Sequence, residues 1–109
     1  MEEKVGSIKI APAVVRTIVA LTTLAVPGVI GLGGGLVNEV KGLLSLRQIK
    51  GVKVQAKDDA LMIDVFIIVE AGSNMLQVGN QVQKEVTQAV DQMIGMPVLA
   101  VNVYIQDIR

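Results

Sequence analysis

The sequence contains no cysteine, no histidine and no tryptophan, and these absences exclude several kinds of chemistry. Without cysteine the chain can form neither a disulfide nor a thiolate nucleophile. Histidine is the commonest metal ligand and the side chain that titrates near neutral pH, so its absence argues against metalloenzymes and against nucleophile–base pairs. We therefore expect no catalytic residues, no metal site and no cofactor.

Aromatic residues are also scarce, and the net charge is zero. Phe66 and Tyr104 are the only aromatic residues, so aliphatic side chains must fill the core and few rings remain for stacking on bases or sugars. The ten basic and ten acidic residues cancel, and a chain without net charge is a poor general ligand for nucleic acid. We expect no nucleic-acid partner; a small nucleic-acid-binding or small-molecule-sensing α/β module is the alternative function.

Apolar residues make up 51% of the 109-residue chain, which is enough for a single domain over residues 1–109. Residues 17–37 carry no charge, and a run of that length would suit a transmembrane helix. Pro27, Gly28 and the glycines at 33–35 interrupt it, and broken backbone in lipid would leave polar groups unsatisfied. We therefore predict a helix, a turn and a short strand in this region.

The spacing of apolar residues predicts an α+β fold. Alternating or β-branched residues predict strands at 5–10, 29–32, 52–56, 61–70 and 98–108. One helix should open at Pro12 and end before Pro27. A longer helix should cover 74–94, with Asn74 and Gly95 as its caps. We predict a two-layer sandwich with both long helices on one face of a mixed or antiparallel sheet, in the order β-α-β-β-β-α-β.

Each long helix should bury one apolar face. For the first helix this face is Val14, Val15, Ile18, Leu21, Thr22 and Ala25. For the second it is Leu76, Gly79, Val82, Val86, Ala89, Val90 and Met93. Gln77, Gln81, Gln88 and Gln92 lie on the wet side of the second helix; ordinary solvent exposure explains them most simply, and a partner helix is the alternative. Strand 61–70 has one apolar face and one mixed face, which another element or subunit would partly cover.

The segment that follows the glycine run is the best candidate for contact with a partner. We predict a flexible, glycine-rich and amphipathic linker at about 33–50. The candidate contact residues are Leu36, Val37, Val40, Leu43, Leu44 and Arg47. No acidic residue occurs between Lys41 and Lys57, so this face could rest on a protein partner or an anionic membrane. Packing on the domain's own core is the simplest of the three explanations.

Smaller motifs have simple structural explanations. The glycines at 31–35 lack the spacing of a dinucleotide fingerprint and the Gly-Lys-Ser/Thr of a phosphate loop, and they fit a linker. Asp58 and Asp59 fit a hairpin turn, and Asp64 an exposed strand face, better than a cation site. Asn102 should have a structural role, on the exposed face or in a bond to a neighbouring strand or loop.

Short motifs along nearly the whole chain add a resemblance to this interpretation. They are Gly6-Ser7-Ile8-Lys9-Ile10, Val26-Pro27-Gly28-Val29, Gly34-Gly35-Leu36-Val37, Gly51-Val52-Lys53-Val54, Val69-Glu70-Ala71-Gly72, Val82-Gln83-Lys84-Glu85-Val86, Met93-Ile94-Gly95-Met96-Pro97-Val98 and Val101-Asn102-Val103. In this order and spacing they resemble the alkaline-shock, or envelope-stress-response, protein family of Gram-positive and related bacteria. The departures, Ala11 for a capping Ser, Ala71 for an aromatic residue and Met96-Pro97 for Gly-Leu, concern local stability.

The resemblance implies a function without catalysis. Members of the family are non-enzymatic, cytoplasmic and self-associating, they are abundant under cell-envelope stress, and some are held at the membrane by a separate anchor protein. We therefore expect a homo-oligomeric interaction or scaffold protein of the stress response. Its expected partners are itself and a membrane-anchor protein, and its expected location is the cytoplasm, with membrane contact through that partner.

Overall fold

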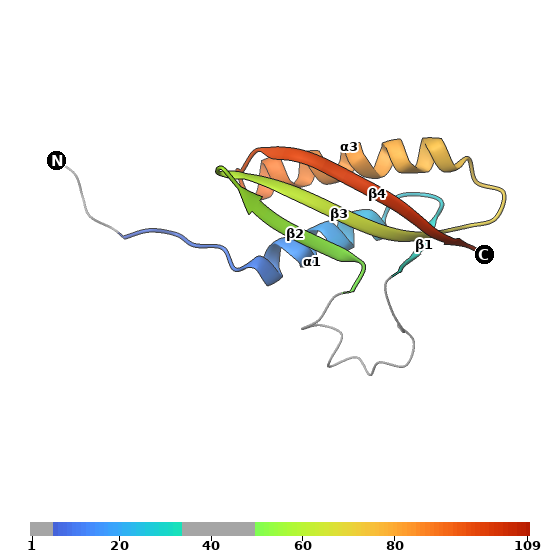
Figure 1. The fold of residues 1–109 in the computed structure, drawn as a ribbon, viewed down its shortest axis with the longest axis horizontal. Helices are drawn as coiled ribbons and strands as arrows, with labels where there is room; N and C mark the ends of the chain where they lie inside the picture. The colour runs from blue at the N-terminus through green and yellow to red at the C-terminus, as the bar shows by residue number, and fades with distance from the viewer. Residues whose placement is uncertain (1–5, 34–49) are drawn as a thin grey trace.

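The computed structural model describes residues 6–33 and 50–109 (Figure 1). Its elements are α1 (Pro12–Leu24), β1 (Val29–Leu32), β2 (Val52–Lys57), β3 (Ala60–Val69), α3 (Met75–Met93) and β4 (Val98–Ile108). Both helices and these four strands occur within a residue or two of their predicted positions, and the α+β fold is confirmed. Residues 34–49, where we predict the linker, lie outside the described part of the chain, and with them the candidate contact residues Leu36, Val37, Val40, Leu43, Leu44 and Arg47.

Local interactions set the ends of the elements. Asn74 caps α3 because its side chain accepts a hydrogen bond from the backbone N–H of Gln77, at 3.0 Å. Gly95 follows this helix with φ +79°, and its N–H donates to the carbonyl of Val90. Asp58 and Asp59 both have positive φ, which gives the tight β2–β3 turn a twist that matches its strands.

Strand β3 lies at the centre of a mixed four-stranded sheet. Strands β2 and β1 pair antiparallel with successive parts of β3, with Val52 opposite Val65 and Val29 opposite Val69. Strand β4 pairs parallel with β3 along its whole length, so β1 and β2 share the other edge. A parallel connection needs a crossover, and α3 provides it.

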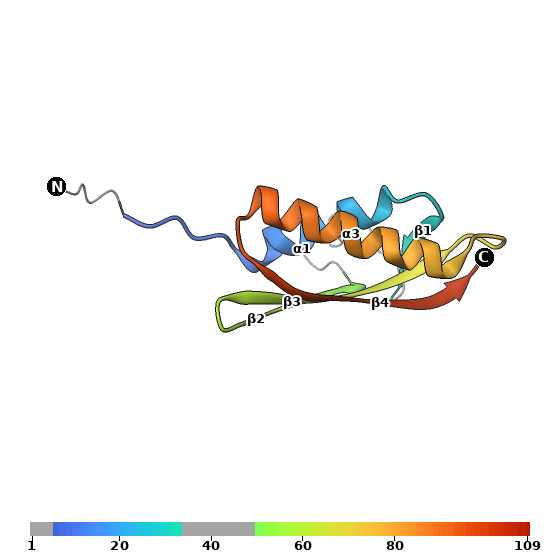
Figure 2. The ribbon, with the colours of Figure 1, turned by 90° about the horizontal axis from the view of Figure 1, so that it is seen from above.

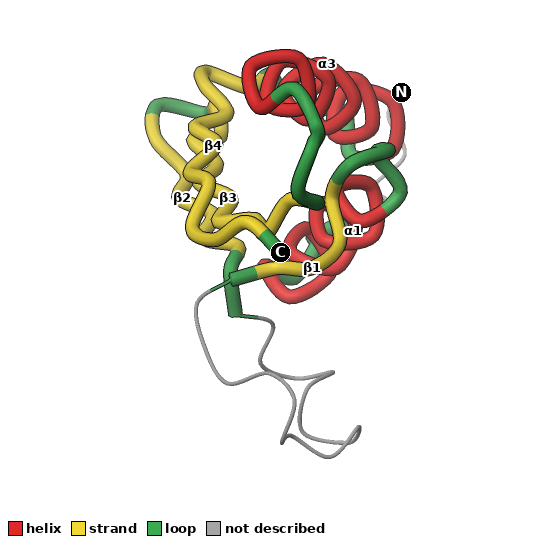
Figure 3. Tube along the Cα trace, turned by 90° about the vertical axis from the view of Figure 1, so that its right-hand side faces the viewer, coloured by secondary structure: helices red, strands yellow, loops and turns green. Residues whose placement is uncertain are grey.

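The two helices pack side by side on one face of the sheet, as predicted (Figures 2 and 3). The core between the layers is aliphatic. Ile63, Val65, Ile67 and Val69 of β3 are fully buried, and they face fully buried valines of the helices, Val19, Val82, Val86 and Val90. Burying each of these side chains adds about 1.5–3 kcal/mol to the free energy of unfolding, compared with leaving it exposed.

The predicted first strand is wrong for the described residues 6–10. This segment is extended but unpaired and leaves the body of the protein, and the side chain of Ile8 is 94% exposed (Figure 1). Alternating apolar residues indicate that a segment can form a strand. A strand also needs a neighbour to complete its backbone hydrogen bonds, and this segment has none in the described part of the chain.

The predicted helix faces are only partly correct. Helix α1 buries Val15, Val19, Ala20 and Thr23, whereas Val14 and Leu21 are exposed. Because α1 is apolar almost all round, its sequence does not distinguish the inner face. Helix α3 buries Val78, Val82, Val86 and Val90, a row with four-residue spacing, and leaves Leu76 and Met93 exposed.

In the described part of the chain no helix combines the length and apolarity needed to cross a membrane. The uncharged run that begins at residue 17 divides, as predicted, into the rest of α1, a turn at Pro27 and Gly28, and β1.

Candidate interaction surfaces

The face of the sheet opposite the helices is the first candidate surface. Met62, Asp64, Phe66 and Ile68 of β3 point to this face and are half-buried. Their neighbours in the chain point to the helices, because side chains alternate along a strand. No helix or strand of the described residues covers this face (Figure 2). It corresponds to the mixed face that the sequence predicts for strand 61–70.

Three side chains from three strands form a row on this face. Phe66 of β3 and Tyr104 of β4 are direct neighbours in register, and their rings stack with centroids 4.7 Å apart and planes 16° apart. The amine of Lys53, on β2, lies 5.6 Å from the centroid of the Phe66 ring. Since β2 and β4 flank opposite edges of β3, Lys53 and Tyr104 cover opposite faces of that ring. We call this row the aromatic stack.

A polar pair lies beside the aromatic stack. The side-chain amide of Asn102 donates a hydrogen bond to Asp64 Oδ1 at 2.9 Å, and the two residues are opposite each other in the β3–β4 register. Asn102 therefore has the predicted bond to a neighbouring strand. The pair satisfies two half-buried polar groups, which are costly to leave without partners.

The described residues on either side of segment 34–49 meet at the aromatic stack. The N–H of Gly33 donates to the carbonyl of Phe66 at 2.7 Å, and the N–H of Phe66 donates to the carbonyl of Gly51 at 2.8 Å. Gly51 has φ +89°, and a Cβ there would lie 2.7 Å from the Gly33 carbonyl oxygen, so only glycine fits. Gly33 and Gly51, which flank segment 34–49 in the sequence, are therefore both bonded to one residue, Phe66.

The sequence alone suggested that two aromatic residues were too few for a stacking platform, yet the sheet brings both together. Their positions in the strand alternation indicate the open face. Only the parallel β3–β4 register makes them neighbours. Both faces of the Phe66 ring are covered, so the outer face of Tyr104, whose side chain is 45% exposed, is the free aromatic surface of the pair.

A groove on the helix layer is the second candidate surface. Two adjoining hollows, of about 470 and 440 Å³, share Pro27 and Gln81 in their walls. All four glutamines of the predicted wet side, Gln77, Gln81, Gln88 and Gln92, line them. The charged lining residues are Glu70 and Glu85, and Gln81 donates a hydrogen bond to Glu85 at 2.8 Å. We call this surface the glutamine groove.

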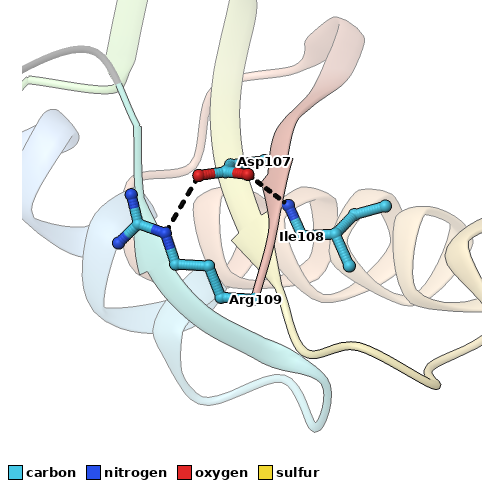
Figure 4. A network of polar contacts seen from close by, with 3 residues as sticks. All are labelled: Asp107, Ile108 and Arg109. Atoms are coloured by element: carbon cyan, nitrogen blue, oxygen red, sulfur yellow. Dashed lines mark hydrogen bonds and ion pairs between the residues drawn. The ribbon is translucent and has the colours of Figure 1, made fainter.

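The end of β4 is held by a small polar network (Figure 4). Asp107 accepts hydrogen bonds from the backbone N–H of Ile108 at 2.8 Å and from the Arg109 side chain at 2.9 Å. The Ile108 bond, and then the Arg109 guanidinium, hold the pKa of Asp107 below its ordinary value. Within residues 6–33 and 50–109, acidic side chains do not gather into a group that could hold a metal ion.

Comparison with known sequences identifies related proteins. The model of the alkaline-shock protein family, described as having a cell envelope-related function, matches residues 1–109. Uncharacterized protein YloU of Bacillus subtilis (strain 168) is 31% identical, and the match covers 100% of this chain and 93% of YloU. Uncharacterized protein Spy1535 of Streptococcus pyogenes serotype M6 is 31% identical, with 97% of this chain and 81% of that protein covered.

Solved structures with a similar fold are distant in sequence. The structure of MamM-CTD H264A has a TM-score of 0.55 and 16% identity, and the match covers 89% of this chain and 98% of that one. MamM-CTD 215-293 has a TM-score of 0.52 and 17% identity, with 86% and 95% covered. At this level of identity the likeness concerns the fold alone.

Proposed function

Because the chain belongs to the alkaline-shock protein family, with its cell envelope-related function, we propose that it is a non-catalytic interaction protein of the envelope stress response. Copies of the chain associate with one another in the cytoplasm, and a membrane-anchor protein holds the assembly near the membrane. The observation that carries this proposal is the open face of the sheet, where the aromatic stack orders side chains from three strands on a surface without a covering element in the described residues.

The composition of this face suits a protein partner. It combines Met62, Ile68 and the aromatic stack with charges of both signs, among them Lys53, Lys57 and Asp64. Aromatic residues and methionine are enriched at protein interfaces, and a surface of balanced charge can be buried without strong repulsion. Because the stacked rings are already ordered, a partner would immobilise few additional side chains.

The linker belongs to the same proposed surface. Its ends, Gly33 and Gly51, are hydrogen-bonded on either side of Phe66. The candidate contact residues Leu36, Val37, Val40, Leu43, Leu44 and Arg47 lie between these two glycines in the sequence. We propose that these residues and the open sheet face contact the anchor protein together.

A capture experiment with the full chain tests this function. The purified chain is cross-linked to detergent-solubilised envelope membranes of its source organism, and captured proteins are identified by mass spectrometry. We expect a defined membrane protein with the wild type, and its loss with Lys53→Glu and with Leu43→Asp. Lys84→Glu is the matched control, because Lys84 is an exposed lysine on α3, in the helix layer.

Two outcomes would contradict this assignment. Equal capture by the wild type and Lys53→Glu would show that the open sheet face is not the contact. If Leu43→Asp unfolds the protein, as judged by circular dichroism, residue 43 belongs to the core.

Nucleic acid is the second candidate, because the structure brings both aromatic residues onto an open sheet beside Lys53. Single-stranded nucleic acid binds by stacking bases on such rings. Tyr104 is the only tyrosine and the chain lacks tryptophan, so its fluorescence reports directly on this site. Quenching by an oligonucleotide that persists at moderate salt would support this candidate over the protein partner.

A further inference from the structure

The N-terminal segment has the properties of a strand without a sheet. Residues 6–10 are extended, as is Ala11 at φ −66° and ψ 142°, and the chain leaves the body of the protein here (Figure 1). Within the described residues its backbone makes no hydrogen bond. Ile8 is 94% and Ile10 is 41% exposed, and on an extended backbone these alternate residues share one face.

Strand β4 has the complementary property, an open edge. In the described part of the chain it pairs only with β3. The Val101 carbonyl accepts a hydrogen bond from the Gln83 side chain of α3 at 3.0 Å, so it points away from β3. The backbone groups of Val103 and Ile105, two and four residues further on, have the same orientation. Beyond Val101 the outward groups of β4 are therefore available to another strand.

Next to this edge of β4, apolar side chains of α3 and β4 are left partly or largely exposed. Leu76 lies two turns before Gln83 on α3, hence on the same side of the helix, yet its side chain is 75% exposed. Helix α3 packs over β4 and runs in the opposite direction, so Leu76 lies toward the C-terminal part of the strand (Figures 1 and 2). Below it, Val103 and Ile105 are only half-buried. An apolar strand paired with this edge would extend the sheet, and its side chains would extend the core between the sheet and α3.

We propose that residues 6–10 of one copy add as a strand to β4 of a second copy. Ile8 and Ile10 then lie beside Val103 and Ile105 and beneath Leu76 of that copy. The backbone groups of residues 6–10 and the outward groups of β4 then become hydrogen-bond partners of each other. The added strand also buries Ile8, the most exposed isoleucine of the described residues. This inference rests on the proposed self-association and specifies the contact that produces it.

The strand must come from another copy. Helix α1 packs on β1 and β2, so the segment emerges on the side of the sheet opposite β4. To reach its own β4 the chain would have to cross the sheet, and residues 6–10 cannot be both the crossing linker and the strand.

The outer edge of β2 is a poorer acceptor than the edge of β4. It exposes Lys53 and Lys57, and lysines discourage strand addition. The added segment itself carries Lys9, so like charges would meet there. Strand β4 contains no lysine.

The test measures self-association of the full chain by analytical ultracentrifugation. The Ile8→Asn/Ile10→Asn variant and the Leu76→Asn variant should each raise the dissociation constant at least about tenfold, because each removes apolar contacts from the same junction. Ile8→Val/Ile10→Val and Met93→Asn are the matched controls, and both should stay within about threefold of wild type. Met93 is also an exposed apolar residue of α3, at its other end.

Hydrogen exchange tests independently whether residues 6–10 form the added strand. Amides of residues 6–10 should be protected in the associated protein and unprotected in the dilute monomer. Protection in the monomer would show that the segment folds onto its own copy, which overturns the inference. Association that is insensitive to Ile8→Asn/Ile10→Asn would overturn the inference alone and leave self-association standing. A chain that stays monomeric at every concentration would remove both, and capture of an anchor protein would be judged separately.

Discussion

Phe66 and Tyr104 stack on the open face of the sheet because a parallel pairing sets them opposite each other on β3 and β4. Stacked pairs of this kind contribute about 0.5–1.5 kcal/mol beyond the area they bury. The same contact orders the surface that we propose for the partner, so a substitution at Tyr104 that removes the stack should affect both stability and binding.

Tyr104→Ala should lower the free energy of unfolding by about 1–2 kcal/mol, because it removes the stacking and part of the buried area. Tyr104→Phe keeps the ring and should change stability by less than about 0.5 kcal/mol. Urea denaturation followed by circular dichroism measures both. Equal stabilities for the two variants would show that the stack contributes nothing.

Gly28→Ala should destabilise the protein by at least about 2 kcal/mol. Gly28 has φ +99°, and an added Cβ would lie 2.7 Å from Val78 Cγ2. Gly72 also has positive φ, but an added Cβ there would meet no atom within 4 Å. Gly72→Ala therefore measures the cost of the backbone conformation alone. Gly79→Ala, inside α3 with free space around the new Cβ, should stabilise by about 0.5–1 kcal/mol. Thermal unfolding should rank the three variants in this order.

Thr23→Val should leave stability unchanged or raise it by about 1 kcal/mol. The Thr23 side chain is fully buried, and its hydroxyl has no hydrogen-bond partner within the described residues. Valine keeps the shape and removes the unsatisfied group. Thr22→Val, one position along α1 and only half-buried, is the control. A loss of stability in Thr23→Val alone, measured by urea denaturation, would show that the hydroxyl has a partner in solution.

Asn102→Asp should destabilise the protein at neutral pH by about 1.5–3 kcal/mol. The substitution replaces the donor to Asp64, now 2.9 Å away, with a second carboxylate. The loss should shrink on acidification, when one of the two carboxyl groups takes up a proton. Asn102→Ala removes the hydrogen bond without adding charge, and its stability should depend less on pH. Parallel curves for the two variants would contradict the like-charge explanation.

Asp107→Asn should change the pH dependence of stability only in acid. The backbone bond from Ile108 and the Arg109 guanidinium lower the pKa of Asp107 in the folded state. A carboxyl with a lowered pKa stabilises the fold above its unfolded pKa of about 3.9 and loses that contribution as the pH falls through the folded value. The variant should therefore lack a small part of the wild-type decline in stability below about pH 4. Urea midpoints measured across this range check the difference.

Much of the fold was predictable because its signals are local. The β2–β3 hairpin, the Asn74 cap, the Gly95 stop and the bounds of β4 depend on residues close together in the chain. The candidate surfaces were predictable only in outline. The glutamines of α3 were assigned to its wet side, but the groove exists because the end of α1 and the turn at Pro27 lie beside them.

The errors have a common physical cause. Ile8 and Ile10 alternate as a strand requires, but the described fold offers them no neighbouring strand. Val14 and Leu21 have the same chemistry as the buried Val15 and Val19 one turn or less away, so only packing against β1, β2 and α3 selects the inner side of α1. In both cases local pattern describes what a segment can do, and contacts with distant segments select among the possibilities.

The amino-acid sequence by itself determined the class of fold, the positions of both helices and four strands, and the lack of cysteine and histidine chemistry, because each depends on composition or on neighbours within a few residues. Only the tertiary structure decided that β4 runs parallel to β3, that Phe66, Tyr104 and Lys53 form one row, and that Gly33 and Gly51 both bond to Phe66. These relations join residues far apart in the chain, and they follow from strand order and register, which the packing of the whole domain sets.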